Sequence, residues 1–547
     1  MDIGQQRIRS GRQDRARLNR CAARVFPLIP KTGKDIRTLS STAATPSLAG
    51  DGFIDLLAKD GITLDMTNQY GRGLVQNQKA NFAPRVGFAY QVTPKLVARG
   101  GFGIFFNSFE NQGYSPNIGE NYPFVYNLSY GAQVPAGSPN GLQGVSPISY
   151  QTPWAGCATA GPGGTATIDA GLSCVALTPA IVNAEGLGLE GAQFNWQTPR
   201  TLSGNLTFQY SINHTLSATA SYVWTHGEDL QAGTGTNNVS QILNYNASTT
   251  NAVPFPDFSH GMSYQETVGA SDYNGLQTKL EQQFSSGLNY LFTYTWAKVF
   301  SDAGDLLNGG STGGFRAPSV PGLGLSFDRG LADFDIRQVL HFSGGYQLPF
   351  GKDKKYLNEG KVTNAVLGGW SANWITTLQG GQPLNIGCVN GTASGLGCNA
   401  VKVAGQSQKL GLHKDTNGAL SWFGNPAAFS QPCEVGNPGQ PAGCITATGS
   451  GVLGDKPGQT VTPGFHRLDF STAKAIQMNE RISLQFRAEF FNILNHPNFN
   501  APGFGGNGVV SIGGSTNYTS NTFGEIGSTR DNPNDPREIQ FALKVYY

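Results

Sequence analysis

Apolar and polar side chains alternate at the end of the chain, where every second residue from 539 to 547 is apolar. The intervening positions from Glu538 to Tyr546 are largely polar. Because successive side chains of a β-strand point to opposite faces, this alternation predicts a strand with one apolar and one polar face. The apolar positions are Ile539, Phe541, Leu543, Val545 and Tyr547.

The same alternation recurs along the chain. We count about thirteen segments of roughly 9 to 14 residues, a length that suits a tilted membrane-spanning strand better than the strands of soluble sheets. Such segments lie at 85–92, 96–106, 202–210, 216–224, 276–284, 288–296, 340–348, about 370–384 and 482–490, and another runs through Leu468 and Phe470. Aromatic residues near their ends, such as Trp224 and Trp296, suit either an interfacial aromatic girdle or the core of a soluble sandwich.

The predicted connections between strands fall into two groups. Turns of about two to four residues alternate with long connections at 131–199, 226–270, 301–334 and 385–464. Short periplasmic turns and long extracellular loops are typical of an outer-membrane barrel, whereas a soluble β-sandwich has no reason to sort its loops by side. The pattern therefore favours an all-β fold, an antiparallel outer-membrane β-barrel, over the sandwich.

Composition agrees with an all-β class and excludes several functions. Charged residues make up 13% of the chain, and the turn formers Gly (74) and Pro (30) are abundant. The net charge of +2 gives no electrostatic reason to expect a nucleic acid as partner. The sequence also lacks the continuous apolar run of about 18 residues that a membrane-spanning helix needs.

Six of the seven cysteines form local pairs inside the predicted long loops. Short closed loops of this kind indicate disulfides in an oxidising compartment, with incidental free thiols as the alternative. A four-thiolate metal site is less consistent with the sequence, because the pairs lack the two-residue spacing of a zinc knuckle. The predicted pairs are Cys157 with Cys174, Cys388 with Cys398, and Cys433 with Cys444.

No residue pattern supports an enzyme, a cofactor or a resident metal. The glycines at 186, 188 and 191 have dinucleotide-binding spacing, but neither a strand before them nor a helix after them is predicted. The seven histidines are scattered and none begins an H-E-x-x-H motif. Aspartates between 302 and 335 could bind calcium, but their spacing departs from an EF-hand, so solvated loop carboxylates are the better interpretation.

Several longer phrases resemble the TonB-dependent receptors of the Oar-like group. Two of them are Asn81-Phe82-Ala83-Pro84-Arg85 with the residues to 90, and the run from Arg99 to Phe106. Further phrases in the same order lie at 273–277, 294–298, 333–337, 465–469, 487–499 and 530–537. The resemblance covers about residues 70–547 and implies a receptor barrel in the cell outer membrane.

Such receptors also carry a signal peptide, a β-sandwich resembling a carboxypeptidase regulatory domain, and a plug domain with a TonB box. We recognise none of these here, and about thirteen strands are fewer than the roughly 22 of a complete transporter barrel. We therefore expect residues 51–547 to be part of a receptor barrel without its plug. Residues 1–50 are basic, with seven arginines between Arg7 and Arg24, and are expected to be disordered or non-native rather than a secretion signal or a nucleic-acid-binding arm.

The resemblance implies binding of a small substrate at extracellular loops, and import driven by the TonB complex through a plug domain. The composition of the predicted loops, rich in Gly, Asn, Ser and Thr, would suit a carbohydrate or a peptide without selecting one. A passive porin-like pore, an adhesion or structural barrel, and a truncated product without function remain alternatives. Outer-membrane lipid and the barrel-assembly machinery are the other expected partners. That machinery would read a C-terminal assembly signal at Phe541, Leu543, Val545 and Tyr547.

Overall fold

One antiparallel sheet dominates the computed structural model. The structure describes residues 78–107, 191–192, 195–236, 262–302, 329–332, 334–352, 354–384, 386, 400–408, 410–415, 418–422, 425–433, 455–456, 458, 460–479, 481–502, 522–530 and 536–547. Within these ranges no helix is long and apolar enough to cross a membrane. The predicted all-β, antiparallel class is confirmed.

Eleven long strands follow one another across this sheet. The strand order is β1-β2-β4-β5-β6-β7-β9-β10-β17-β18-β19, and the two-residue strands β3 (Gly191–Ala192) and β8 (Gly330–Leu331) add to β6 and β7. The long strands are β1 (Arg85–Thr93), β2 (Leu96–Phe106), β4 (Arg200–Ser211), β5 (Leu216–Thr236), β6 (Met262–Ser285), β7 (Leu288–Ser301), β9 (Gln338–Gln347), β10 (Trp370–Gln379), β17 (Phe465–Gln477), β18 (Ser483–Phe491) and β19 (Glu538–Tyr546).

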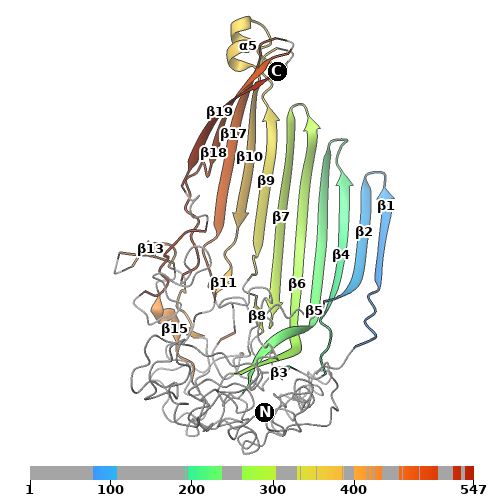
Figure 1. Ribbon diagram of the computed structural model, residues 1–547, viewed down its shortest axis with the longest axis vertical. Helices are drawn as coiled ribbons and strands as arrows, with labels where there is room; N and C mark the ends of the chain where they lie inside the picture. Colours follow the sequence, from blue (N-terminus) through green and yellow to red (C-terminus); the bar gives the residue numbers. More distant parts are fainter. Residues whose placement is uncertain are drawn as a thin grey trace, which may run out of the picture.

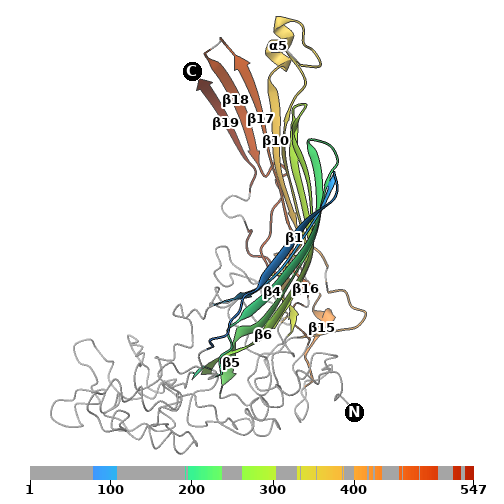
Figure 2. The ribbon, with the colours of Figure 1, turned by 90° about the vertical axis from the view of Figure 1, so that its right-hand side faces the viewer.

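The sheet forms a single curved layer with β1 and β19 at its two edges (Figures 1 and 2). It is an open part of a barrel wall in the described residues, so the strand number of a closed barrel stays a prediction. The short turns and the C-terminus lie at one end of the sheet in Figure 1. This end is called the turn end below, and the opposite end is called the loop end.

Local hydrogen bonds explain why the hairpins turn where they do. Asn213 accepts hydrogen bonds from the backbone N–H groups of Thr215 and Leu216 at 2.8 and 2.9 Å, which closes the β4–β5 turn. Asn479 closes the β17–β18 turn in the same way. Between β6 and β7, Ser286 and Gly287 both have positive φ angles of 52° and 87°, as a two-residue hairpin turn requires.

The strand register places the predicted apolar positions on one face throughout. Residues opposite each other in an antiparallel pair share a face, and the pairings connect even-numbered positions from β1 to β18 and odd-numbered positions in β19. One register row across this face contains Tyr90, Ala98, Phe208, Ala220, Thr278, Tyr294, Leu340 and Leu378. Aromatic contacts such as Phe342 with Trp374 lie on this apolar face.

Glycines on the apolar face leave room for large aromatic neighbours. Gly204 lies directly opposite Trp224, and a Cβ atom at Gly204 would lie 2.6 Å from the indole nitrogen. Trp224 also stacks on Phe102 of β2, with ring centroids 6.0 Å apart. The glycine thus lets one indole ring lie over β4 and join three strands, which a side chain at 204 would prevent.

Gly204→Val should lower the free energy of unfolding by about 1 to 3 kcal/mol, since the added side chain displaces the Trp224 ring. The three atoms nearest to a Cβ at this position all belong to Trp224. The penalty should therefore be much smaller in a Trp224→Ala background, a coupling that a double-mutant cycle in a lipid folding assay measures. Equal penalties in both backgrounds would contradict the contact.

Two predicted boundaries were wrong. The expected loop 226–270 is strand at both of its ends, because β5 continues to Thr236 and β6 begins at Met262. The 348–370 connection at the turn end contains helix α5 (Lys361–Leu367), which the alternation did not predict. The predicted strand 370–384 ends at Gln379, after which the two-residue strand β11 (Pro383–Leu384) pairs with β16 (Thr460–Val461).

The connection from β10 to β17 has a core of its own. β12 (Val401–Lys402) pairs with β15 (Phe429–Ser430), β13 (His413–Lys414) pairs with β14 (Leu420–Ser421), and a short 3₁₀ turn, η8 (Pro426–Ala428), precedes β15. A cluster of buried apolar residues holds these pieces together: Ile386, Ala400, Ala428, Phe429 and Phe523. The described part of this connection, together with Phe523 from the β18–β19 connection, is therefore a packed structure and not only a connector.

Candidate functional site: the polar face and the loop end

The face opposite the apolar one is covered with hydroxyl, amide and charged side chains. Thr207 of β4 and Ser221 of β5 share a hydrogen bond of 2.6 Å between their hydroxyls. His341 of β9 contacts the Thr377 hydroxyl of β10 at 3.1 Å. Such groups cover this polar face from β1 to β19, so it suits water and polar solutes.

Three ion pairs lie on the polar face, each between residues two apart in one strand. They are Lys279 with Glu281 at 2.8 Å, Arg467 with Asp469 at 2.9 Å, and Arg487 with Glu489 at 3.3 Å. Residues two apart in a strand point to the same side, so each pair stays on this face.

The first two pairs lie level with each other across the sheet. The register connects Lys279 through His341 to Arg467, and the next row on this face connects Glu281 to Asp469. Two cations, Lys279 and Arg467, therefore share one row of the polar face, and two anions, Glu281 and Asp469, share the next row. This arrangement offers a polar solute both signs of charge but no catalytic grouping.

The phrases that carry the family resemblance meet at the loop end of β17, β18 and β19. Asp469 accepts a hydrogen bond from the backbone N–H of Asn492 at 2.8 Å. Asn495 accepts one from the backbone N–H of Arg537 at 3.0 Å. The 465–469, 487–499 and 530–537 phrases thus fix how three neighbouring strands leave the sheet, which is a structural role.

A second group of charges crosses the sheet at the loop end on the apolar face. Arg200 of β4 donates to Glu228 of β5 at 2.7 Å, and His226 lies 3.3 Å from Glu228 and also contacts Asp272 of β6. Arg329 then contacts Asp272 and lies 3.5 Å from Asp302. We call these six residues the charge ladder.

The charge ladder begins one register row beyond Trp224. His226 occupies the next row of the same face, and Glu228 the row after that. Charges are costly in hydrocarbon and are stable at a polar interface, whereas tryptophan prefers the boundary between the two. On β5 this face is therefore apolar only up to Trp224, and the strand continues beyond that point with charged residues.

Asp302, directly after β7, is buried at the loop end with 6% of its surface exposed. Burial raises the pKa of Asp302 above 3.8, although the Ala270 N–H and Arg329 oppose the shift. Burial likewise raises the pKa of Asp335, whose carboxylate accepts a hydrogen bond of 2.8 Å from the Val299 N–H. Both aspartates are structural acceptors here, while Asp305, Asp328 and Asp333 lie outside the described residues.

A raised pKa means that the folded chain binds more protons than the unfolded chain. The contribution of Asp302 to the free energy of unfolding is therefore fully present below pH 3.8 and is lost as the pH rises through the raised pKa. We expect the stability difference between the parent and Asp302→Asn to decline over that window. Unfolding measured at stepwise pH tests this, and a difference that grows with pH would contradict it.

The structure reaches only part of the predicted cysteine and assembly sites. Cys433 is disulfide-bonded. Its partner and the cysteines at 157, 174, 388, 398 and 444 lie outside the described residues, so the three pairings remain predictions. Phe541, Leu543 and Val545 lie in edge strand β19, and Tyr547 follows it. Within the described residues, no group of three or more His, Cys, Asp or Glu side chains is placed to bind a metal ion.

Comparison with known proteins identifies one family. A family model described as an outer membrane beta barrel domain matches residues 28–540. Curated protein sequences give no match.

Among solved structures, the chain is similar to the outer membrane transporter YddB from Escherichia coli at 8% identity and a TM-score of 0.37, over 85% of this chain and 40% of YddB. It is similar to the pyoverdine receptor FpvA from Pseudomonas aeruginosa PAO1 at 9% identity and a TM-score of 0.33, over 86% of this chain and 36% of FpvA. It is similar to the siderophore receptor PirA from Acinetobacter baumannii at 12% identity and a TM-score of 0.34, over 85% of this chain and 41% of PirA. The chain thus spans about two fifths of the length of these structures.

Proposed function

Since the chain belongs to the family of outer membrane β-barrel domains, we propose that it forms part of the wall of a TonB-dependent transporter that takes up a small polar substrate. As a member of this family it is a protein of the cell outer membrane and not an enzyme. The observation that carries the proposal is the two-faced sheet, with one apolar face and one face of hydroxyls, amides and ion pairs. In a membrane barrel, lipid covers the first face and the second lines an aqueous lumen.

Import in place of passive flow is supported by the sequence phrases that resemble TonB-dependent receptors of the Oar-like group. Three of these phrases pack together at the loop end of β17, β18 and β19. The packed core between β10 and β17 also suits a receptor, because a loop with its own core holds a binding surface in shape. A carbohydrate or a peptide would match the hydrogen-bonding groups of the polar face.

A passive pore is the second candidate, and the ion pairs of the polar face favour it. Charged pairs such as Lys279 with Glu281 and Arg467 with Asp469 would keep a water-filled channel hydrated for solutes of either sign. An adhesion barrel would need only the loops. Passage of solutes through the lumen therefore distinguishes the transporter, the passive pore and the adhesion barrel better than any property of the loops does.

Two measurements on cells that make this protein test the proposal. Uptake of fluorescently labelled oligosaccharides and oligopeptides should depend on this gene and should stop when TonB is deleted or the proton-motive force is collapsed. Protein purified from the native outer membrane should give no steady conductance in planar bilayers. Uptake that persists without TonB, together with steady conductance, would contradict import and support the passive pore.

A further inference from the structure

A polar cleft lies at the loop end beside the charge ladder. It has a volume of about 300 Å³, the low end of the range for small-molecule sites. Residues 78–81, which lead into β1, form one wall, and residues 197–200, which lead into β4, form the other. Phe106 at the end of β2 and Asp229 of β5 complete the lining.

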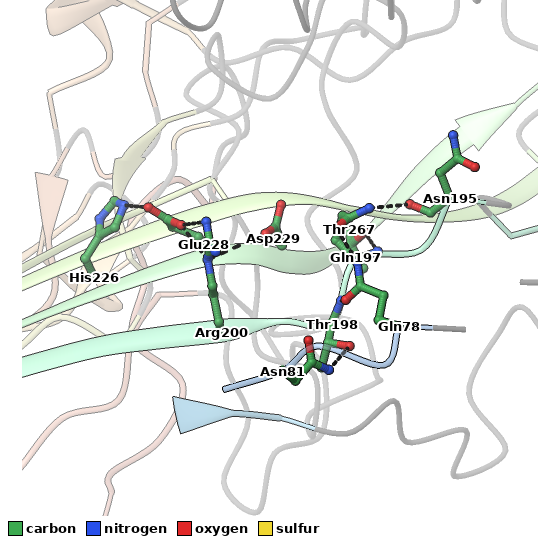
Figure 3. A network of polar contacts seen from close by, with 10 residues as sticks. All are labelled: Gln78, Asn81, Asn195, Gln197, Thr198, Arg200, His226, Glu228, Asp229 and Thr267. Atoms are coloured by element: carbon green, nitrogen blue, oxygen red, sulfur yellow. Dashed lines mark hydrogen bonds and ion pairs between the residues drawn. The ribbon is translucent and has the colours of Figure 1, made fainter. Parts of the chain in front are cut away.

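Hydrogen bonds between the two walls hold the cleft in shape (Figure 3). Asn81 donates to the Thr198 hydroxyl at 2.9 Å, and the Thr198 backbone N–H donates to Gln78 at 2.8 Å. Gln78 and Gln197 join their side-chain amides. The Gln197 N–H donates to Thr267 of β6 at 3.0 Å, which ties the second wall to the sheet. The cleft is therefore built by contacts between segments far apart in the sequence.

The lining has the chemistry that recognises sugars. Side-chain amides both donate and accept hydrogen bonds, as sugar hydroxyls do, and each retains further capacity beyond the bonds just described. Phe106 adds an aromatic ring, whose face suits the C–H side of a pyranose. Lys79 and Arg200 bring two positive charges to the cleft. Arg200 is paired with Glu228 and lies 3.9 Å from Asp229, so these two carboxylates balance the cations and a free phosphate finds little net positive charge here.

We propose that this cleft binds a hydroxylated sugar ring. Phe106 and Arg200 lie opposite each other in the register, on the apolar face and in the same row as Glu228. The site is thus separate from the polar face that would line the lumen, and the inference goes beyond the import proposal. Two register rows beyond Trp224, it lies beside the charge ladder, at the level of glycolipid head groups or of free saccharides outside the cell.

The test uses the full chain folded in detergent micelles. Isothermal titration with N,N′-diacetylchitobiose and maltose measures free sugars, and co-sedimentation with lipopolysaccharide vesicles, against vesicles of phosphatidylglycerol alone, measures the lipid source. Phe106→Leu and Asn81→Ala should each weaken binding about fivefold or more, the value of one contact. Phe106→Tyr keeps the aromatic ring and should therefore retain sugar binding.

Matched controls separate the cleft from the fold. Phe208→Leu repeats the phenylalanine change, and Gln209→Ala likewise truncates a side-chain amide, both in β4 away from the cleft. Both variants should bind as the parent does, and circular dichroism verifies folding of every variant. Weakening confined to the cleft variants supports the site, with a free sugar or a glycolipid as the source according to the arm that responds. Absence of binding in both arms, or equal binding by the cleft and control variants, would overturn it. No uptake is measured, so failure here is distinguishable from failure of the import proposal.

Discussion

Leu543→Arg should destabilise the protein folded in a lipid bilayer by about 2 to 4 kcal/mol, or block assembly, if this position lies near the bilayer midplane. Leu543 pairs with Phe486 of β18, and Phe486 stacks on Phe541 with ring centroids 6.1 Å apart. These side chains share the apolar face, so the new guanidinium would enter hydrocarbon. Folding titrations in phospholipid vesicles measure the loss.

Lys544→Glu is the matched control in the same strand. Lys544 lies opposite Gln485 on the polar face, so reversal of its charge should have a small effect in water. The face assignment of β19 requires the two substitutions to differ, and equal losses would show that it is wrong.

Removal of Tyr546 and Tyr547 should reduce the amount of protein assembled in the outer membrane more than it reduces the stability of barrels already inserted. Tyr547 continues the apolar row of β19 at the turn end, where an amphipathic ring suits the membrane interface. The Tyr546 hydroxyl makes only an exposed 3.3 Å contact with Gln485. The deletion thus removes little packing but interrupts the proposed signal for the barrel-assembly machinery.

Outer-membrane levels of the parent and the deletion, measured by immunoblot of membrane fractions, test this expectation. A deletion within the loop between 401 and 420 is the control, because it leaves β19 intact. Parent-like levels after the terminal deletion would contradict the role of Tyr547 as part of an assembly signal.

The sheet was predictable because alternation is a property of single strands. Each strand of the β6–β7 hairpin shows its apolar face without reference to a neighbour, and Ser286-Gly287 marks the turn. The extensions of β5 and β6 were missed because their side chains at the loop end, such as His226 and Asp272, are polar on the apolar face as well. Alternation fades where a strand leaves the apolar band, although the backbone ladder continues.

The candidate sites were not predictable for a different reason. Arg200 and Glu228 are unremarkable charges in the sequence and join only through the register of β4 and β5. Arg329 reaches Asp272 only because β8, which it precedes, pairs with β7. The walls of the cleft come from residues more than a hundred positions apart, such as Asn81 and Thr198. One signal was available in the sequence: extension of the predicted 202–224 hairpin by one residue pair on the same face places Arg200 opposite Glu228.

The central claim is that the two faces of this sheet meet lipid and water respectively, and β7 tests it most directly. Phe292 and Thr293 are adjacent at the middle of the strand and belong to the apolar and polar faces. A fluorophore attached to Phe292→Cys, with the protein folded in vesicles, should be quenched by brominated lipid and shielded from aqueous iodide. The same fluorophore on Thr293→Cys should show the reverse, and equal or exchanged quenching at the two positions would contradict the barrel-wall account.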